Sequence, residues 1–170
     1  MPEPHSVLNA LDTAAAQSAL RRCCGAARWV RAMAEARPFA STPALFAAAE
    51  RHWQELDSAD YLEAFSHHPQ IGEDLGALKQ RFAHTLALST AEQAGVTAAD
   101  ERTLVALRDA NVAYRARFGF IFIVCASGKS AAELLAALLE RLANDLAREL
   151  AIAAAEQAKI TRLRLAGLGA

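Results

Sequence analysis

A proline directly after a histidine is the feature that most constrains how this chain can fold. Pro69 lacks the N–H that would continue a helix, and its ring pushes His68 toward extended backbone. A helix that enters from Tyr61 must therefore end at this pair, which places the His68 imidazole at a helix exit. Because the pKa of histidine lies near neutrality, the position suits proton transfer. Taken alone, a histidine–proline pair is most often only a helix stop.

The rest of the chain has the composition of a helical protein. Its 170 residues are 54% hydrophobic but only 6% aromatic, and much of the apolar content is alanine, a strong helix former. This length is enough for one domain with a real core and short for two. We therefore predict an all-α, single-domain helical bundle over residues 1–170.

Charge and cysteine content restrict the partners. The net charge of −1 gives no electrostatic support for binding nucleic acid or an anionic membrane. Cys23, Cys24 and Cys125 fit neither a disulfide framework nor a zinc site. No apolar run is long enough to cross a bilayer, and the N-terminus lacks an export signal. We expect a cytoplasmic protein, and its charge is compatible with a small neutral or anionic ligand.

Helix start signals divide the chain further. Thr42 before Pro43 predicts an N-cap with proline in the first turn. Ser58 opens the helix that stops at the histidine–proline pair. Thr97 with Asp100 predicts the start of a long helix.

The second half of the chain has equally clear signals. Gly119 is expected to end the long helix after Phe118, and Ser130 with Glu133 forms a capping box. Helix formers then fill residues 131–165, with an interruption near residues 144–145. Apolar faces are predicted at Leu104, Leu107, Val112 and Tyr114, and at Leu146, Leu150, Ala153 and Ile160.

One segment departs from the helical pattern. Residues 118–125 have the β-branched and aromatic composition of a strand but no second strand to pair with. We predict a short extended segment near residues 120–124, whose backbone a polar ligand could help to satisfy; a loop of core residues or a buried helix start is the alternative. The following Ser127-Gly128-Lys129-Ser130 resembles the end of a phosphate-binding loop. Because Ile123 stands where that loop needs glycine, we interpret the run as a turn and a helix cap.

Two other groups of residues have both a structural and a functional interpretation. The run Ser89-Thr90-Ala91-Glu92-Gln93 has the spacing of a capping box, but a helix start with a carboxylate and a carboxamide can also bind an amide-rich ligand. His67, His68 and His84 could suggest a metal site. No metal-binding motif accompanies them, so we predict none.

In order and spacing, these pieces resemble the 2-oxo-4-hydroxy-4-carboxy-5-ureidoimidazoline (OHCU) decarboxylases of urate degradation. The resemblance covers nearly the whole chain and is carried by several motifs. They are Trp29, Arg37-Pro38-Phe39, His68-Pro69-Gln70-Ile71-Gly72, Ser89-Thr90-Ala91-Glu92-Gln93, Phe118-Gly119-Phe120-Ile121-Phe122-Ile123 and Leu163-Arg164-Leu165. It implies an all-α carboxy-lyase without metal or organic cofactor, which converts OHCU to (S)-allantoin, and it allows a homodimer.

The resemblance also implies roles for individual residues. His68 matches the catalytic histidine and proton donor, whereas His67 does not match. The residues that match the substrate site are Pro69, Ser89, Thr90, Ala91, Glu92, Gln93, Phe120, Ile121, Phe122, Ile123, Val124 and Arg164. A register error along the helix would exchange Arg164 with Arg162. Ile121 departs from a common family form, which has proline there.

Two other classes of protein remain as alternatives. A helical interaction module could keep this scaffold without the chemistry, but His68, Glu92 and Gln93 are all present. A metal-dependent hydrolase could use the histidines, and sensitivity to a chelator would reveal it.

Overall fold

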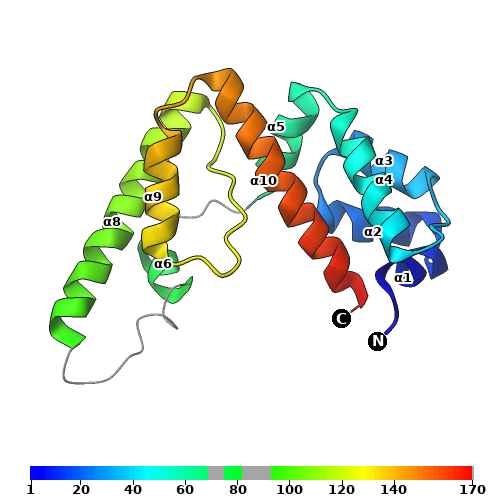
Figure 1. Cartoon of the computed structure of the whole chain (residues 1–170), viewed down its shortest axis with the longest axis horizontal. Helices are drawn as coiled ribbons and strands as arrows, with labels where there is room; N and C mark the ends of the chain where they lie inside the picture. The colour runs from blue at the N-terminus through cyan, green and yellow to red at the C-terminus, as the bar shows by residue number, and fades with distance from the viewer. Residues whose placement is uncertain (69–74, 82–92, 170) are drawn as a thin grey trace. The chain divides into compact units, whose positions relative to one another are not determined.

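The chain is helical through most of its described length (Figure 1). The computed structural model describes residues 1–68, 75–81 and 93–169, and it contains no β-strand within these ranges. The predicted all-α fold is confirmed. The helices are α1 (Pro4–Ala10), α2 (Thr13–Cys23), α3 (Ala27–Glu35), α4 (Thr42–Gln54), α5 (Ser58–Ser66), α6 (Leu75–Arg81), α8 (Gln93–Phe118), α9 (Ala131–Arg141), α10 (Leu146–Ala166) and the 3₁₀ turn η1 (Gly167–Gly169).

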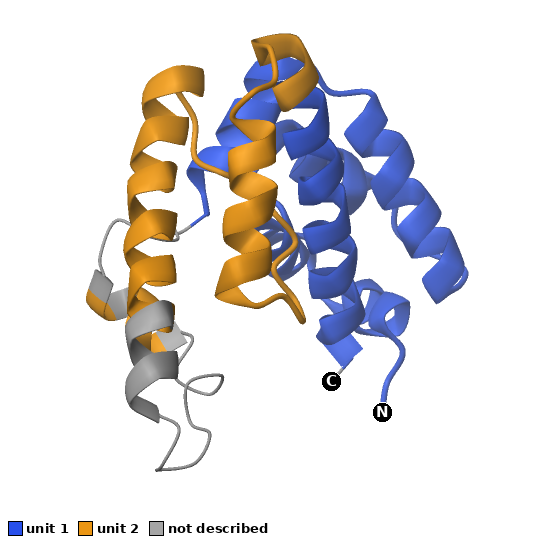
Figure 2. Cartoon of the chain, turned by 60° about the vertical axis from the view of Figure 1, so that its left-hand side comes forward, with its two compact units in different colours: residues 1–68, 150–170 blue, residues 69–149 orange. Residues whose placement is uncertain are grey.

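Contacts group the chain into two compact units (Figure 2). Unit 1 consists of residues 1–68 and 150–170, and unit 2 consists of residues 69–149. Helix α10 supplies its first turn to unit 2 and the remainder to unit 1. One OHCU decarboxylase-like domain over residues 1–170 stays a prediction.

Two buried tryptophans hold the helices of unit 1 together. Trp29 on α3 donates its indole N–H to the carbonyl of Ala49 on α4 at 3.0 Å. Trp53 on α4 donates in the same way to the carbonyl of Ala154 on α10, also at 3.0 Å. Each ring fills the core while its one polar atom is satisfied by backbone, the arrangement that a buried indole needs.

The Arg37-Pro38-Phe39 motif has a structural role in unit 1. Arg37 Nη1 donates to the carbonyls of Leu8 at 2.6 Å and Leu11 at 2.7 Å, at the end of α1. Asn9 completes the joint, since its side chain accepts from the Phe39 amide at 2.9 Å and donates to the Phe39 carbonyl at 2.8 Å. The loop that carries the buried Phe39 is thereby tied to the end of α1.

Unit 2 contains the helix end and the helix start that the sequence predicts most clearly. Helix α8 ends at Phe118, and Gly119 follows with φ +79°, a conformation that favours glycine. Ser130 Oγ accepts from the Glu133 amide at 3.2 Å, and Glu133 Oε2 accepts from the Ser130 amide at 2.8 Å. The predicted stop and capping box are confirmed. The turn at residues 127–128, with Gly128 at φ +74°, agrees with the interpretation of this run as a turn before a helix cap.

Two predicted N-termini were wrong. Ser41, not Thr42, caps α4, with its Oγ accepting from the Ala44 amide at 3.2 Å. The Thr42 hydroxyl instead donates to Glu3 at 2.6 Å. Helix α8 begins at Gln93, so Thr97 lies inside it. At α4 a second capping-type residue, Ser41, precedes Thr42, and local pattern alone does not separate the two.

Predicted apolar faces were correct only in part. Leu104, Leu107 and Tyr114 are buried, but Val112 is 55% exposed, and Leu146 on α10 is 57% exposed. Ala153 is buried as predicted, and the buried side of α10 also carries Ala154, Gln157, Thr161 and Leu165. Two polar side chains thus take core positions, which an apolar count does not detect.

The helices give no sign of a membrane span. Over the described part of the chain, each helix is too short or too polar to cross a bilayer.

Candidate active site

His68 follows the last turn of α5 in unit 1. The helix ends at Ser66, His67 is its C-cap, and the His68 amide donates to the Phe65 carbonyl at 3.1 Å. The imidazole is half-buried, and its Nε2 is hydrogen-bonded to the side-chain oxygen of Gln157 on α10. The predicted placement of an imidazole at a helix exit is confirmed, whereas Pro69 lies outside the described residues.

Gln157 connects this imidazole to two further buried groups. Its side chain is 0% exposed, and its amide Nε2 donates to Thr161 Oγ1 at 3.1 Å. Thr161 also hydrogen-bonds the thiol of Cys24, which is 0% exposed. A chain of polar groups therefore runs from His68 through Gln157 and Thr161 to Cys24, and we call these four residues the histidine network.

Burial and neighbouring charge both act on His68. Burial lowers the pKa of its imidazole, the hydrogen bond to Gln157 opposes that shift, and the positive charge of Arg164 lowers the pKa further, with a smaller contribution from His67. The neutral imidazole is therefore favoured at neutral pH. The same effect makes the imidazolium, once formed, a stronger acid than free histidine.

The two candidate arginines lie in different places. Arg164 Nη1 donates to the backbone carbonyls of Arg22 at 3.3 Å and Cys23 at 3.5 Å, and its charge acts on His68. Arg162 instead stacks its guanidinium carbon 4.2 Å from the centre of the Phe46 ring. Of the two, only Arg164 contributes to the electrostatics of His68.

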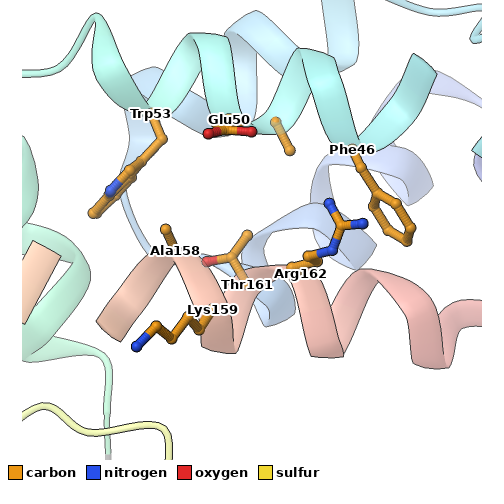
Figure 3. A pocket seen from close by; sticks show the side chains of 8 residues that line it. Phe46, Glu50, Trp53, Ala158, Lys159, Thr161 and Arg162 are labelled. Atoms are coloured by element: carbon orange, nitrogen blue, oxygen red, sulfur yellow. The ribbon is translucent and has the colours of Figure 1, made fainter. Parts of the chain in front are cut away.

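Arg162 belongs to a hollow of about 190 Å³ between α4 and α10 (Figure 3). Phe46, Glu50 and Trp53 line it from α4, and Arg162 and Thr161 line it from α10. His68 does not line this hollow. Thr161 is shared, because its hydroxyl also bonds Gln157 in the histidine network.

The side chain of His67, the residue before His68, packs directly against Gly25. A Cβ atom added to the buried Gly25 would lie 2.4 Å from His67 Cγ and 2.6 Å from His67 Cβ. Only a residue without a side chain permits this approach. Gly25 therefore fixes where the backbone leaves α5, one residue before His68.

The predicted extended segment belongs to unit 2. Residues 121–126 have no regular secondary structure, and Phe120, Phe122, Ile123 and Val124 are buried. The predicted departure from the helical pattern near residues 120–124 is confirmed, and the run consists of mostly buried residues without a strand. Its phenylalanines pack on Tyr114 of α8, with ring centres 5.8 Å away for Phe120 and 5.3 Å for Phe122.

A buried ion pair between Arg141 and Glu149 contacts this segment. Arg141 on α9 donates to the Ile123 carbonyl at 2.7 Å and pairs with Glu149 at 2.6 Å, and its guanidinium lies 4.5 Å over the Phe122 ring. Tyr114 also donates to Glu149, and burial raises the pKa of this phenol. Asn144 donates to the other carboxylate oxygen of Glu149 at 2.9 Å, and we call Tyr114, Arg141, Asn144 and Glu149 the ion-pair network. A protein side chain thus satisfies one backbone carbonyl of the segment, for which a polar ligand was one possible partner.

Part of the predicted substrate site is not described. Pro69, Ser89, Thr90, Ala91 and Glu92 lie outside the described residues, and Gln93 is the first residue of α8. Their roles stay predictions, as do those of Phe120, Ile121, Phe122, Ile123, Val124 and Arg164.

Sequence reasoning missed Gln157 and Thr161. A signal was present, because Ala153, Gln157, Thr161 and Leu165 recur every four residues and share one helix face. Polar residues inside such an apolar stripe need buried partners. The sequence alone does not say that the partner of Gln157 is a histidine 89 residues away.

The cysteines are free thiols, and burial raises the pKa of Cys23 and Cys24 to about 11. Side chains of His, Cys, Asp and Glu nowhere gather in a group of three suited to a metal ion, within the described ranges.

Comparisons with known proteins agree on one family. The family model described as OHCU decarboxylase matches residues 9–166. A protein from Arabidopsis thaliana named uric acid degradation bifunctional protein TTL is 42% identical over 86% of this chain, although the chain spans only 45% of its length. The protein from Amia calva named 2-oxo-4-hydroxy-4-carboxy-5-ureidoimidazoline decarboxylase is 35% identical over 76% of this chain and 73% of its own length.

A solved structure supports the same grouping. The crystal structure of an OHCU decarboxylase in the presence of (S)-allantoin is 38% identical and superposes with a TM-score of 0.69. The match covers 87% of this chain and 94% of that one. With the family model matching most of its length, the chain belongs to the OHCU decarboxylase family of carboxy-lyases.

Proposed function

We propose that this chain decarboxylates OHCU to (S)-allantoin without a cofactor, with His68 as the proton donor. The observation that carries the proposal is the half-buried imidazole at the exit of α5, which is hydrogen-bonded to Gln157 and lies within the field of Arg164. The family match and the (S)-allantoin named with the related crystal structure support the choice of substrate and product.

The substrate explains why a proton donor is the main requirement. OHCU carries its carboxylate on a ring carbon next to an imine carbon. When the bond to the carboxylate breaks, its electron pair forms a carbon–carbon double bond and the imine pair moves to the ring nitrogen, which takes up a proton. The substrate thus acts as its own electron sink, and the protein must control where the next proton goes.

His68 is suited to move that proton. The intermediate has a hydroxyl on one carbon of the new double bond and the ureido group on the other. A neutral imidazole accepts the hydroxyl proton while the carbonyl forms, and the imidazolium then protonates the ureido carbon on one face. The overall reaction consumes one proton and releases carbon dioxide. The lowered pKa of His68 favours both the neutral starting form and the acidity of the imidazolium.

The remaining predicted residues would hold the substrate around this histidine. Arg164 would pair with the carboxylate or a carbonyl, as a guanidinium does well. Glu92 and Gln93 would bind the hydroxyl and ureido groups, with Pro69 and residues 89–91 beside them, and residues 120–124 would present backbone to the ring. A homodimer and a cytoplasmic location stay predictions.

The test is the optical signal of allantoin. The protein is added to urate with urate oxidase and hydroxyisourate hydrolase, and circular dichroism is followed against a sample without it. Rapid formation of a persistent (S)-allantoin signal, unchanged by a chelator, is the expected result. Slow racemic decay in the presence of well-folded protein would refute the proposal and favour an interaction module. Loss of the rate on chelation would favour the metal-dependent alternative.

A further inference from the structure

Gln157 is a buried amide with a partner at each end. Its oxygen faces Nε2 of His68, and its nitrogen donates to Thr161 Oγ1 at 3.1 Å. Its side chain is 0% exposed, so water does not replace either partner. A buried polar group without a partner costs free energy. The orientation of the Gln157 amide and the positions of its two partners therefore depend on one another.

The orientation of this amide determines the histidine tautomer. A carboxamide oxygen can only accept a hydrogen bond, so His68 must donate from Nε2. A neutral imidazole carries one ring hydrogen, and Nδ1 is then the nitrogen with the lone pair. Thr161 holds the amide in this orientation by accepting from its nitrogen, and Thr161 is itself bonded to the Cys24 thiol.

We propose that Gln157 is a positioning residue that fixes His68 as the Nε2–H tautomer and assigns Nδ1 to proton exchange with the substrate. The inference rests on the proposed function of His68. A histidine held in the wrong tautomer keeps its place but presents a hydrogen where the reaction needs a lone pair. Nδ1 would take the hydroxyl proton and return it to the ureido carbon, while the Nε2–H bond to Gln157 stays intact throughout.

The tautomer can be measured without any substrate. Protein labelled with ¹⁵N in histidine is examined above the pKa of His68 by long-range proton–nitrogen correlation, with His68→Asn to assign the signals. We expect the Nε2–H form in the wild type and a mixture of both forms in Gln157→Met, which keeps the volume but loses the acceptor. An Nδ1–H signal in the wild type would overturn the inference, whether or not the protein is a decarboxylase.

Kinetics test whether the tautomer matters for turnover. Gln157→Met is expected to lower kcat about tenfold to a hundredfold with little change in KM, a loss of the size found when a group that orients a metal-bound histidine is removed. Gln157→Glu places a carboxylate on Nε2, which stabilises the imidazolium and moves the pH profile of kcat to higher pH. Unchanged kcat and pH profile in both variants would overturn the positioning role even if the tautomer is as expected.

A pair of variants at Thr161 separates a loss of the hydroxyl from a loss of folding. Thr161→Ser keeps the hydroxyl that holds Gln157 and should retain kcat, whereas Thr161→Val should lower it. Gln54→Met, on the exposed end of α4, is the matched control for losing a glutamine side chain. Equal kcat for Thr161→Ser and Thr161→Val, both folded by circular dichroism, would contradict a role for this hydroxyl in orienting the amide.

Discussion

The two buried polar networks differ in charge and in how they end. The ion-pair network of unit 2 joins Arg141 to Glu149, whose carboxylate is 0% exposed and also receives bonds from Tyr114 and Asn144. The histidine network of unit 1 is built from uncharged groups and ends on a half-buried imidazole. In the first, the Glu149 carboxylate is bound from several sides by protein groups alone, as suits a structural element. The second ends on a group that can still exchange a proton, as the proposed role of His68 requires.

The largest effect is expected from breaking the ion-pair network. Glu149→Leu leaves the Arg141 charge buried without its partner, and removing one member of such a pair costs about 3–5 kcal/mol. Urea unfolding followed by circular dichroism measures this loss. Glu101→Ala, which removes an exposed partner of Lys79, is the control and should change stability little. If Arg141→Met combined with Glu149→Leu is no more stable than Glu149→Leu alone, the explanation by an unpaired charge is wrong.

A smaller effect is expected at the glycine beneath His67. Gly25→Ala places a Cβ 2.4 Å from His67 Cγ, and overpacking of this kind costs about 1–3 kcal/mol. Gly167→Ala is the matched control, because nothing lies within 4 Å of the added atom. The free energies of unfolding of the two variants are compared in urea. Equal stability would show that the α5 exit adjusts freely and does not fix the approach to His68.

The histidine network should contribute less to stability than to turnover. Gln157→Met removes two hydrogen bonds between neutral groups but keeps the packing, and neutral bonds contribute about 0.5–1.5 kcal/mol each. The same urea experiment is used. A loss as large as that of Glu149→Leu would mean that the two networks do not differ as described.

Stability should also depend on pH through His68. The pKa of His68 is lower in the folded state than its ordinary value of 6.5. As the pH falls through 6.5, His68 therefore becomes protonated in the unfolded chain while it stays neutral in the folded chain, and this favours unfolding. The free energy of unfolding should therefore decrease more from pH 7.5 to pH 5.5 in the wild type than in His68→Gln. His67→Gln is the control variant. If the free energy of unfolding of the wild type depends on pH as weakly as that of His68→Gln, then His68 is not the source of the pH dependence.

The smallest effect is expected on the reactivity of the three cysteine thiols. Burial raises the pKa of Cys23 and Cys24 to about 11, so both remain protonated thiols at neutral pH. Titration with a thiol reagent at pH 7.5 should modify the half-buried Cys125 first, and the other two only at the rate of unfolding. Cys125→Ser is then expected to abolish the early phase. An early phase that survives in this variant would show that the end of α2 opens in the native state.

Local signals predicted much of the fold because they act over a few residues. The Ser130–Glu133 capping box and the stop at Gly119 each depend only on adjacent backbone. Pairings across long distances were not predictable in this way. Arg141 reaches Ile123 and Gln157 reaches His68 only after helices have packed, and each puts a polar side chain where the pattern favours an apolar one.

The candidate site divides in the same manner. The position of His68 follows from the proline after it, and that part of the prediction is confirmed. The choice of Arg164 over Arg162 as the charge that acts on His68 needed the structure, since residues two apart on a helix face different sides. The Phe120–Val124 run was recognised as unusual, but its partner Arg141 carries no local signal.

The most direct test of the account compares two neighbouring histidines. Initial rates of (S)-allantoin formation are measured by circular dichroism for His68→Asn and His67→Asn, with both proteins shown to be folded. The account predicts that His68→Asn loses about 10² to 10⁴ in rate, the range for a general acid–base, while His67→Asn keeps most of the wild-type rate. A folded His68→Asn variant that still forms (S)-allantoin at the wild-type rate would contradict it.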